Sequence, residues 1–319
     1  MNRVLLAYSG GVRSSAAIAW LAETVGAEVV ALTLDIGQGG ELESTRDRAL
    51  ALGAIRAHVL DVRDEFVRQY LVPALKADAL YEDGRSRAAL LSRALIAQKL
   101  VEIAVIEQTS AVAHAAKSGD QIGLAVRALA PNVNVLVLPP GEPVFGHMQA
   151  GGFERFAAAT RTPGECPDEP AFVEITFTRG APAAINGITM PLVDLIGSLD
   201  IIAGAHGVGR SEGLESPAAV VLDAAHRDLQ ALTITGQADH FSRGVSRQFA
   251  DVIAQGAWFT PLREALAAYI DTIQSGVSGV VRLQLFKGGC AIVDHRVQAA
   301  EAGVAAPARK LTFVATAKA

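Results

Sequence analysis

Cysteine is scarce in this chain of 319 residues, where only Cys166 and Cys290 occur. Two thiols far apart in the sequence have no metal-site spacing and make no disulfide framework, so we expect a reducing, cytoplasmic environment. Long apolar runs are also missing, since no stretch reaches the roughly 20 residues that a transmembrane helix needs. The apolar run at the N-terminus is broken at residues 9–11, too early for a secretory signal. We therefore expect no membrane association.

An excess of positive charge is absent as well. The formal net charge is −5 and the isoelectric point is about 5.8. This balance argues against a protein dedicated to binding nucleic acid or an anionic membrane surface. Half of the residues are hydrophobic, which is enough for the core of one large domain or of two ordinary ones.

One turn of small residues stands between an apolar run over residues 4–7 and a helical pattern that follows it. The turn and its flanks consist of Ala7, Tyr8, Ser9, Gly10, Gly11, Val12, Arg13, Ser14 and Ser15. Two glycines let backbone N–H groups approach a ligand closely, and the start of a helix adds a partial positive charge. The pattern indicates a cradle for phosphate or pyrophosphate. The alternative is a glycine-rich strand–helix turn that holds no ligand.

The first half of the chain alternates apolar runs with amphipathic stretches. Strands are expected at 4–7, 29–34, 57–60, 111–114 and 133–138, and helices at 41–52, 64–75, 90–106 and 121–130. Asp64 suits the N-cap of the helix over 64–75. The alternation is typical of an α/β fold with a doubly wound parallel sheet, which binds ligands at the carboxyl ends of its strands.

Prolines and glycines punctuate residues 139–170, which we interpret as a linker or an irregular connection. We place a domain boundary near residue 165, giving domains over 1–165 and 166–319. The second half is predicted to be α+β, with a turn at Asn186-Gly187 and a closing hairpin of strands 280–286 and 290–293. Its helices are expected at 192–205, 217–229, 245–255 and 262–274.

Six segments together resemble the argininosuccinate synthase family. They are 7–11 (AYSGG), 32–39 (LTLDIGQG), 75–82 (LKADALYE), 97–104 (AQKLVEIA), 203–210 (AGAHGVGR) and 258–266 (WFTPLREAL). The resemblance is collinear and covers most of residues 1–295.

This resemblance implies an ATP-pyrophosphatase nucleotide domain, of the adenine nucleotide alpha hydrolase-like type, followed by a synthetase domain. It implies a cytoplasmic homo-oligomer, a dimer or tetramer, that uses ATP and Mg²⁺ and acts on small amino-acid-like substrates in arginine biosynthesis. Members adenylate the ureido oxygen of citrulline and release pyrophosphate, after which the amino group of aspartate displaces AMP. Positioning and charge stabilisation carry such a reaction.

The resemblance assigns the ATP site to the turn described above and to the second strand. The positions that correspond to this site are Ala7, Tyr8, Ser9, Gly10, Gly11, Arg13, Ser14, Ser15, Thr33, Leu34 and Gln38. Two of them depart from the family, which has a small alanine at Leu34 and an aspartate at Arg13 on the metal–pyrophosphate side. An arginine there exchanges a Mg²⁺ partner for a direct phosphate partner. The alternative is an exposed arginine at a helix start.

Tyr81, Asp120 and Gln121 match substrate-binding positions of the family, and Arg13 and Asp120 are the candidate catalytic residues. Gly123 stands where the family has its arginine for citrulline. Segments that carry further citrulline contacts are missing between residues 138 and 167 and after residue 210. The alternatives are a packing role for Tyr81 and a helix N-cap for Asp120. His114 fits a hydrogen-bonded structural histidine, and no metal-ligand cluster is expected.

Three functions follow from these residues. The first is an ATP-dependent C–N ligase of argininosuccinate synthase type with an altered acceptor. The second is a non-catalytic paralogue that keeps the fold and a nucleotide or anion. The third is a different reaction that uses the same cradle without adenylation.

Overall fold

The computed structural model describes residues 3–39, 42–82, 85–116, 120–138, 160–210, 216–234 and 236–298. The described residues form two compact units. The first comprises those within Met1–Arg63, Ala89–Gly151 and Val252–Thr260, and the second those within Asp64–Ala88, Gly152–Asp251 and Pro261–Ala319. Among them, no helix is both long enough and apolar enough to cross a bilayer.

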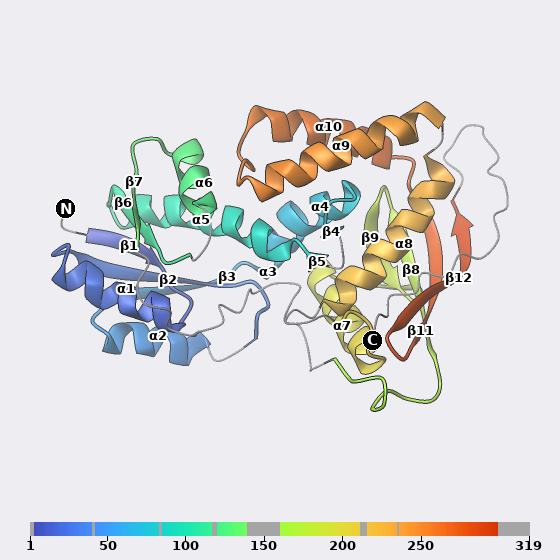
Figure 1. The fold of residues 1–319 in the computed structure, drawn as a ribbon, viewed down its shortest axis with the longest axis horizontal. Coiled ribbons are helices and arrows are strands. Elements are labelled where there is room, and N and C mark those ends of the chain that lie inside the picture. Colours follow the sequence, from blue (N-terminus) through green and yellow to red (C-terminus); the bar gives the residue numbers. More distant parts are fainter. Residues whose placement is uncertain are drawn as a thin grey trace. The chain divides into compact units, whose positions relative to one another are not determined.

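The first unit is built on a five-stranded parallel sheet in the order β3-β2-β1-β6-β7. The strands are β1 (Arg3–Ala7), β2 (Glu28–Asp35), β3 (Arg56–Asp61), β6 (Ala111–His114) and β7 (Asn134–Val137). The helices are α1 (Val12–Glu23), α2 (Leu42–Ala51), α5 (Ala88–Ile106) and α6 (Gln121–Leu129). In Figure 1, α1 and α2 lie on one side of this sheet and α5 and α6 on the other. The predicted doubly wound sheet is confirmed.

The strand order reverses between β1 and β6, whose register pairs Leu6 with Ala113. The helices that follow these two strands, α1 and α6, lie on opposite faces of the sheet (Figure 1), and sheets of this kind bind ligands outside the carboxyl ends of the strands at such a point. Apolar side chains of β1 and α1, including Val4, Ile18 and Leu21, are fully buried beneath that edge. The packed core therefore holds the turn after β1 in place.

The segment predicted as one helix over 64–75 contains three pieces. They are α3 (Arg63–Phe66), the π-helical turn η1 (Val67–Leu71) and α4 (Val72–Lys76). Pro73 has no N–H and its ring crowds the carbonyl one turn earlier, which accounts for the wider turn before it. The prediction of Asp64 as N-cap is wrong, because the helix begins at Arg63, whose N–H donates to Asp61 Oδ1 at 3.1 Å.

The second unit contains a five-stranded antiparallel sheet in the order β10-β9-β8-β11-β12. Its strands are β8 (Ala171–Thr178), β9 (Ala181–Ile185), β10 (Ile188–Thr189), β11 (Gly279–Phe286) and β12 (Gly289–Val297). A two-stranded ribbon pairs β4 (Tyr81–Glu82) with β5 (Arg85–Ser86). The helices are α7 (Leu192–Ala205), α8 (Pro217–Thr233), α9 (Gly236–Ala254) and α10 (Pro261–Gln274). The predicted α+β class of the second half is confirmed.

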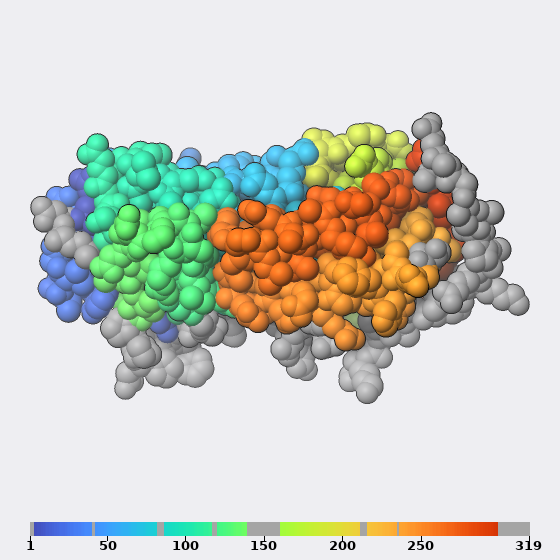
Figure 2. Space-filling model, turned by 90° about the horizontal axis from the view of Figure 1, so that it is seen from above, coloured from blue at the N-terminus to red at the C-terminus, as the bar shows by residue number. Residues whose placement is uncertain are grey.

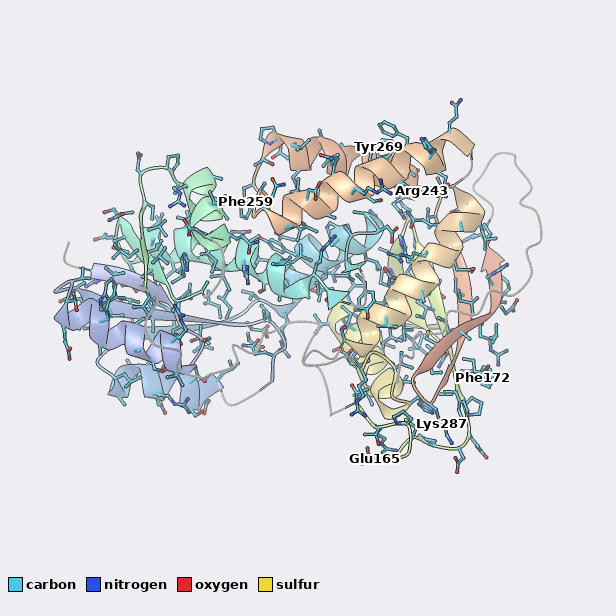
Figure 3. The ribbon with its side chains drawn as sticks, in the orientation of Figure 1. Glu165, Phe172, Arg243, Phe259, Tyr269 and Lys287 are labelled. Atoms are coloured by element: carbon cyan, nitrogen blue, oxygen red, sulfur yellow. The ribbon has the colours of Figure 1, made fainter. Side chains whose placement is uncertain are left out.

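One face of this sheet is apolar, since Ile175, Phe177 and Leu283 are fully buried, and α8 packs on β11 and β12. The predicted turn at Asn186-Gly187 is confirmed, with positive φ at both residues, as hairpin turns of this sequence require. The predicted hairpin of β11 and β12 is also confirmed, and Lys287 lies at its tip (Figure 3).

Helix α9 starts nine residues before its predicted first residue, 245. Its early turns are polar and exposed, so they carry little of the apolar periodicity on which the prediction depended. Phe241 on α9 meets Tyr269 on α10 edge-on, with ring centroids 5.1 Å apart. Figure 2 shows in orange the outer surface that α9 and α10 present, and Figure 3 labels Tyr269.

Candidate functional site: the turn after β1 and the start of α6

The turn after β1 is held by its own hydroxyl groups. Ser14 Oγ donates to Gly11 O at 3.0 Å, and the N–H of Ser9 donates to Ser14 Oγ at 3.3 Å. Tyr8, which is 3% exposed, places its hydroxyl 3.2 Å from Ser15 Oγ. These bonds shape the turn before any ligand is present, so binding need not order it.

Two backbone features leave donors facing outward from this turn. Gly10 has φ +73°, and a Cβ there would lie 3.0 Å from Thr45 Cγ2, so only glycine fits without strain. Gly11 is the N-cap of α1 and no side chain caps that helix. The first N–H groups of α1 therefore remain available to an anion.

Strand β2 supports the turn from the neighbouring position in the sheet. Thr33, which is buried, donates its hydroxyl to Tyr8 O at 3.0 Å, and the N–H of Tyr8 donates to Leu32 O at 2.8 Å. Leu34, at the carboxyl end of β2, is 9% exposed. Gln38 is occupied within its own loop, because Nε2 donates to Leu34 O at 2.7 Å and Oε1 accepts from the N–H of Ile36 at 2.8 Å. Gln38 thus shapes the loop after β2.

Two arginines adjoin the turn, and only one of them was singled out from the sequence. The Nε of Arg13 is buried and has no hydrogen-bond partner among the described residues. Arg48 on α2 donates from Nη1 to Gly10 O at 3.1 Å. No local pattern pointed to Arg48, because its approach depends on how α2 packs beside the sheet.

Asp120 opens α6 close to the carboxyl end of β6. Its Oδ1 accepts from the N–H of Gly123 at 3.1 Å, so Asp120 is the N-cap of that helix. His114 places Nε2 at 3.1 Å from the same oxygen, and Arg127 donates to Oδ2. Burial raises the pKa of Asp120, but the hydrogen bonds of Arg127 and His114 outweigh it and hold the pKa below its usual value. Both carboxylate oxygens are therefore engaged within the protein.

His114 is 1% exposed, and burial holds its pKa below the usual value despite the neighbouring Asp120. The N–H of Ala116 points at His114 Nδ1 at 3.4 Å. This contact assigns the acceptor role to Nδ1 and the proton to Nε2, which donates to Asp120. A neutral, buried and doubly bonded imidazole orients Asp120.

The remaining two substrate positions of the sequence analysis lie in different units. Gln121 belongs to the first, where its Oε1 accepts a hydrogen bond from Arg93 and its Nε2 donates one to the carbonyl of Ala254. Tyr81 belongs to the second, where its carbonyl accepts from Arg227 at 3.2 Å. Burial raises the pKa of the Tyr81 hydroxyl, and the charge of Asp223 adds to the effect. Among the described residues, no group of three or more His, Cys, Asp or Glu side chains could hold a metal ion.

Comparisons with known proteins identify the family of the chain. The models of the arginosuccinate synthase N-terminal HUP domain and C-terminal domain match residues 3–146 and 147–301. Argininosuccinate synthase from Carboxydothermus hydrogenoformans is 37% identical over 90% of this chain and 86% of that protein. That from Pelotomaculum thermopropionicum is 38% identical over 91% and 86%, and that from Symbiobacterium thermophilum 38% over 92% and 88%.

A solved structure, a predicted tRNA methyltransferase subunit from Methanocaldococcus jannaschii, overlaps 43% of this chain and 69% of its own at 16% identity, with a TM-score of 0.33 that carries no conclusion. The sequence relatives and both family models confirm the predicted resemblance across nearly the whole chain. The chain therefore belongs to the argininosuccinate synthase family of ATP-dependent ligases.

Proposed function

We propose that this protein is an ATP-dependent C–N ligase whose acceptor is not citrulline. A carbonyl or ureido oxygen of the acceptor attacks the α-phosphorus of ATP, and pyrophosphate leaves. The amino group of aspartate, or of a similar amine, then attacks the activated carbon, loses a proton and displaces AMP. The free energy released by cleaving ATP to AMP and pyrophosphate thus drives formation of the C–N bond.

One observation carries the altered acceptor, and it concerns Gly123. A Cβ at this position would lie 2.1 Å from Asp120 Oδ1. The citrulline arginine of the family therefore cannot be accommodated here unless Asp120 moves out of its N-cap position. A substrate that has lost a charge-assisted hydrogen bond binds more weakly by roughly 1.5–3 kcal/mol. This cost favours an acceptor that does not call for an arginine at position 123.

In this proposal the chain's own residues act mainly by binding and orientation. The N–H groups at the start of α1 and the hydroxyl of Ser9, which is exposed, donate to phosphate oxygens. Thr33 and Tyr8 hold the turn rigid from beneath. Donors already aimed at a departing pyrophosphate stabilise the charge that develops on it.

A second function is favoured by the state of Asp120 and Gln121. The polar side-chain atoms of both are hydrogen-bonded within the first unit. Asp120 is bound by His114 and Arg127, and Gln121 by Arg93 and the carbonyl of Ala254. A non-catalytic paralogue that retains a nucleotide or anion would have no need of these groups for substrate. The two functions differ in whether pyrophosphate is released.

We also propose the settings that the family implies for this chain. They are a cytoplasmic location, a homo-oligomer and a small amino-acid-like substrate. The domain boundary near residue 165, which the composition of residues 139–170 indicates, stays a prediction. Tyr81 is proposed to contact the acceptor, and the turn after β1 the nucleotide. Size-exclusion chromatography with light scattering would test the homo-oligomer.

The experiment is pyrophosphate release from ATP, measured with the full chain and a panel of ureido and amino acids in the presence of aspartate. We expect release with an acceptor other than citrulline, and less with citrulline. Ser9→Ala is the matched loss-of-donor variant, and Ser278→Ala, in the second unit, is the control. Release with citrulline above all other acceptors would refute the altered acceptor. ATP binding without release on any member of the panel would favour the paralogue.

A further inference from the structure

The segment that carries Tyr81 is joined to α8 by one arginine. Arg227, on α8, donates from Nε to Asp78 Oδ1 and from Nη2 to Tyr81 O, the latter at 3.2 Å. Asp223, one turn earlier on the same helix, places Oδ2 3.4 Å from Arg227 Nε. All four residues belong to the second unit. A single guanidinium therefore holds residues 78–81 at two points against a helix that packs on the sheet of this unit.

The backbone at Asp78 has an uncommon conformation for a residue with a side chain. Asp78 follows the end of α4 with φ +52°. Its N–H donates to Leu75 O at 3.0 Å, and the N–H of Ala79 donates to Ala74 O at 2.9 Å. This pair of bonds is the Schellman motif, in which the residue of positive φ is usually glycine. An aspartate adopts that φ at a cost in free energy, and the bond that its side chain makes with Arg227 offsets the cost.

The two carboxylates beside Arg227 fix its charge and its direction. Burial lowers the pKa of Arg227, but the charges of Asp223 and Asp78 outweigh burial and raise the pKa above its usual value. Asp223 is 8% exposed, whereas the side chain of Arg227 is 48% exposed. A buried carboxylate beside Nε restricts the rotamers of the long arginine side chain before it meets residues 78–81. Arg227 is therefore a preorganised donor and not a mobile surface charge.

The hydroxyl of Tyr81 lies outside this network. Arg227 binds the carbonyl of Tyr81, and no hydrogen bond joins the Tyr81 hydroxyl to another residue that the structure describes. A phenol hydroxyl without a partner can donate one hydrogen bond and accept another. The backbone of Tyr81 is therefore fixed, while the polar end of its side chain stays available to a ligand.

We propose that Arg227 is a positioning residue, which holds Tyr81 where its hydroxyl meets the acceptor. This inference rests on the proposed contact between Tyr81 and the acceptor, and it names the residue on which that contact depends. Arg227 acts through the carbonyl of Tyr81 and through Asp78. Without the guanidinium, residues 78–81 lose both attachments to α8. A displacement of about 1 Å at a substrate contact can lower the rate by about a hundredfold.

Fluorine NMR of the full chain, labelled with 3-fluorotyrosine, reports on Tyr81 without any substrate. The chain has four tyrosines, and Tyr81→Phe identifies the resonance of Tyr81. We expect Arg227→Met to shift or broaden that resonance, and Arg227→Lys, which keeps the charge, to do so less. Arg243→Met is the matched control, because Arg243 also pairs with an aspartate one turn earlier, Asp239, on helix α9 (Figure 3). A Tyr81 resonance that is unchanged in a folded Arg227→Met variant would overturn the proposal.

Pyrophosphate release separates positioning from a general loss of structure. With the acceptor that supports release, we expect Arg227→Met to raise the KM for the acceptor by about tenfold and the KM for ATP by less than about twofold. The turn proposed to bind ATP belongs to the first unit, so a local change at Tyr81 should spare it. Equal rises in the two KM values, or no rise in either, would overturn the proposal. If the unaltered chain releases no pyrophosphate with any acceptor, the proposed ligase fails, and the Tyr81 resonance still decides whether Arg227 positions Tyr81.

Discussion

Two buried carboxylates, one in each unit, have pKa values shifted in opposite directions. Glu107 in the first unit is 2% exposed and Asp200 in the second is 1% exposed. Glu107 meets Arg56 Nη1 and His58 Nε2, both at 2.7 Å, and Arg3 at 3.4 Å. Burial raises its pKa, but the hydrogen bonds of His58 and Arg56 outweigh burial and bring the pKa below the usual value.

Asp200 has far less help. Its Oδ1 accepts from the N–H of Ala218 at 2.8 Å, at the start of α8, and its Oδ2 has no partner among the described residues. Burial therefore raises the pKa of Asp200 to about 7. The comparison teaches that a buried carboxylate stays ionised only where cationic side chains bind it, because burial alone favours its protonated form. The ion-pair cluster of Glu107 lies at the amino ends of the parallel strands. At their carboxyl ends, the turn after β1 leaves the first N–H groups of α1 without a side-chain cap.

The largest effect should come from Asp200→Asn. Because the folded pKa is raised to about 7 from 3.8, the folded state holds a proton that the unfolded state has lost between these values. Stability therefore falls as pH rises through that window, by up to about 4 kcal/mol. Asparagine imitates the protonated form and keeps the acceptor for Ala218. We expect the variant to be more stable than the parent at pH 8 and nearly equal at pH 4, in urea unfolding at a series of pH values. Parallel pH profiles would contradict this expectation.

Glu107→Gln sharpens the other side of the comparison. It removes the charge that Arg56, His58 and Arg3 share, and we expect a loss of about 3 kcal/mol in the free energy of unfolding at neutral pH. Glu28→Gln, which breaks only an exposed pair with Arg3, should change stability by less than about 1 kcal/mol. Equal effects of the two substitutions in urea titrations would show that burial does not decide the worth of these pairs.

Gly123→Ala tests a third carboxylate, Asp120, whose environment is mixed. The new Cβ would displace the Asp120 side chain from its N-cap and from His114, so we expect a loss of about 1–2 kcal/mol. Gly244→Ala in α9, where no atom lies within 4 Å of a new Cβ, should be neutral or stabilising. Thermal unfolding of both variants measures the difference. A neutral Gly123→Ala would mean that Asp120 can leave its cap freely and is available to a substrate.

Thr33→Val should have the smallest effect. It removes one uncharged hydrogen bond, from the buried Thr33 hydroxyl to Tyr8 O, at a cost of about 1 kcal/mol. The turn after β1 loses a support, so nucleotide affinity should fall a few-fold. Thr178→Val, at an exposed end of β8, is the control for both readouts. Unchanged affinity in calorimetry would show that β2 does not position the turn.

Much of the fold could be predicted because it depends on local patterns. The apolar runs of β1, β2 and β6, the hairpin of β11 and β12 and the turn at Asn186-Gly187 lie where the sequence analysis placed them. The strand β9 was missed, since Ala181–Ile185 contains little of the β-branched or aromatic pattern that marks a strand. The π-turn before Pro73 was missed because propensity does not report the spacing of backbone hydrogen bonds.

The candidate site divides in the same way. Amino-acid order alone determined the family, from six short segments in the same order, and the glycine turn between a strand and a helix, because each segment consists of adjacent residues. Only the tertiary structure decided that Arg48 adjoins Gly10 and that Asp120 is bound by His114 and Arg127. These contacts join elements whose spacing in the chain carries no signal. They arise from the packing of helices on the sheet, which brings distant residues within hydrogen-bonding distance.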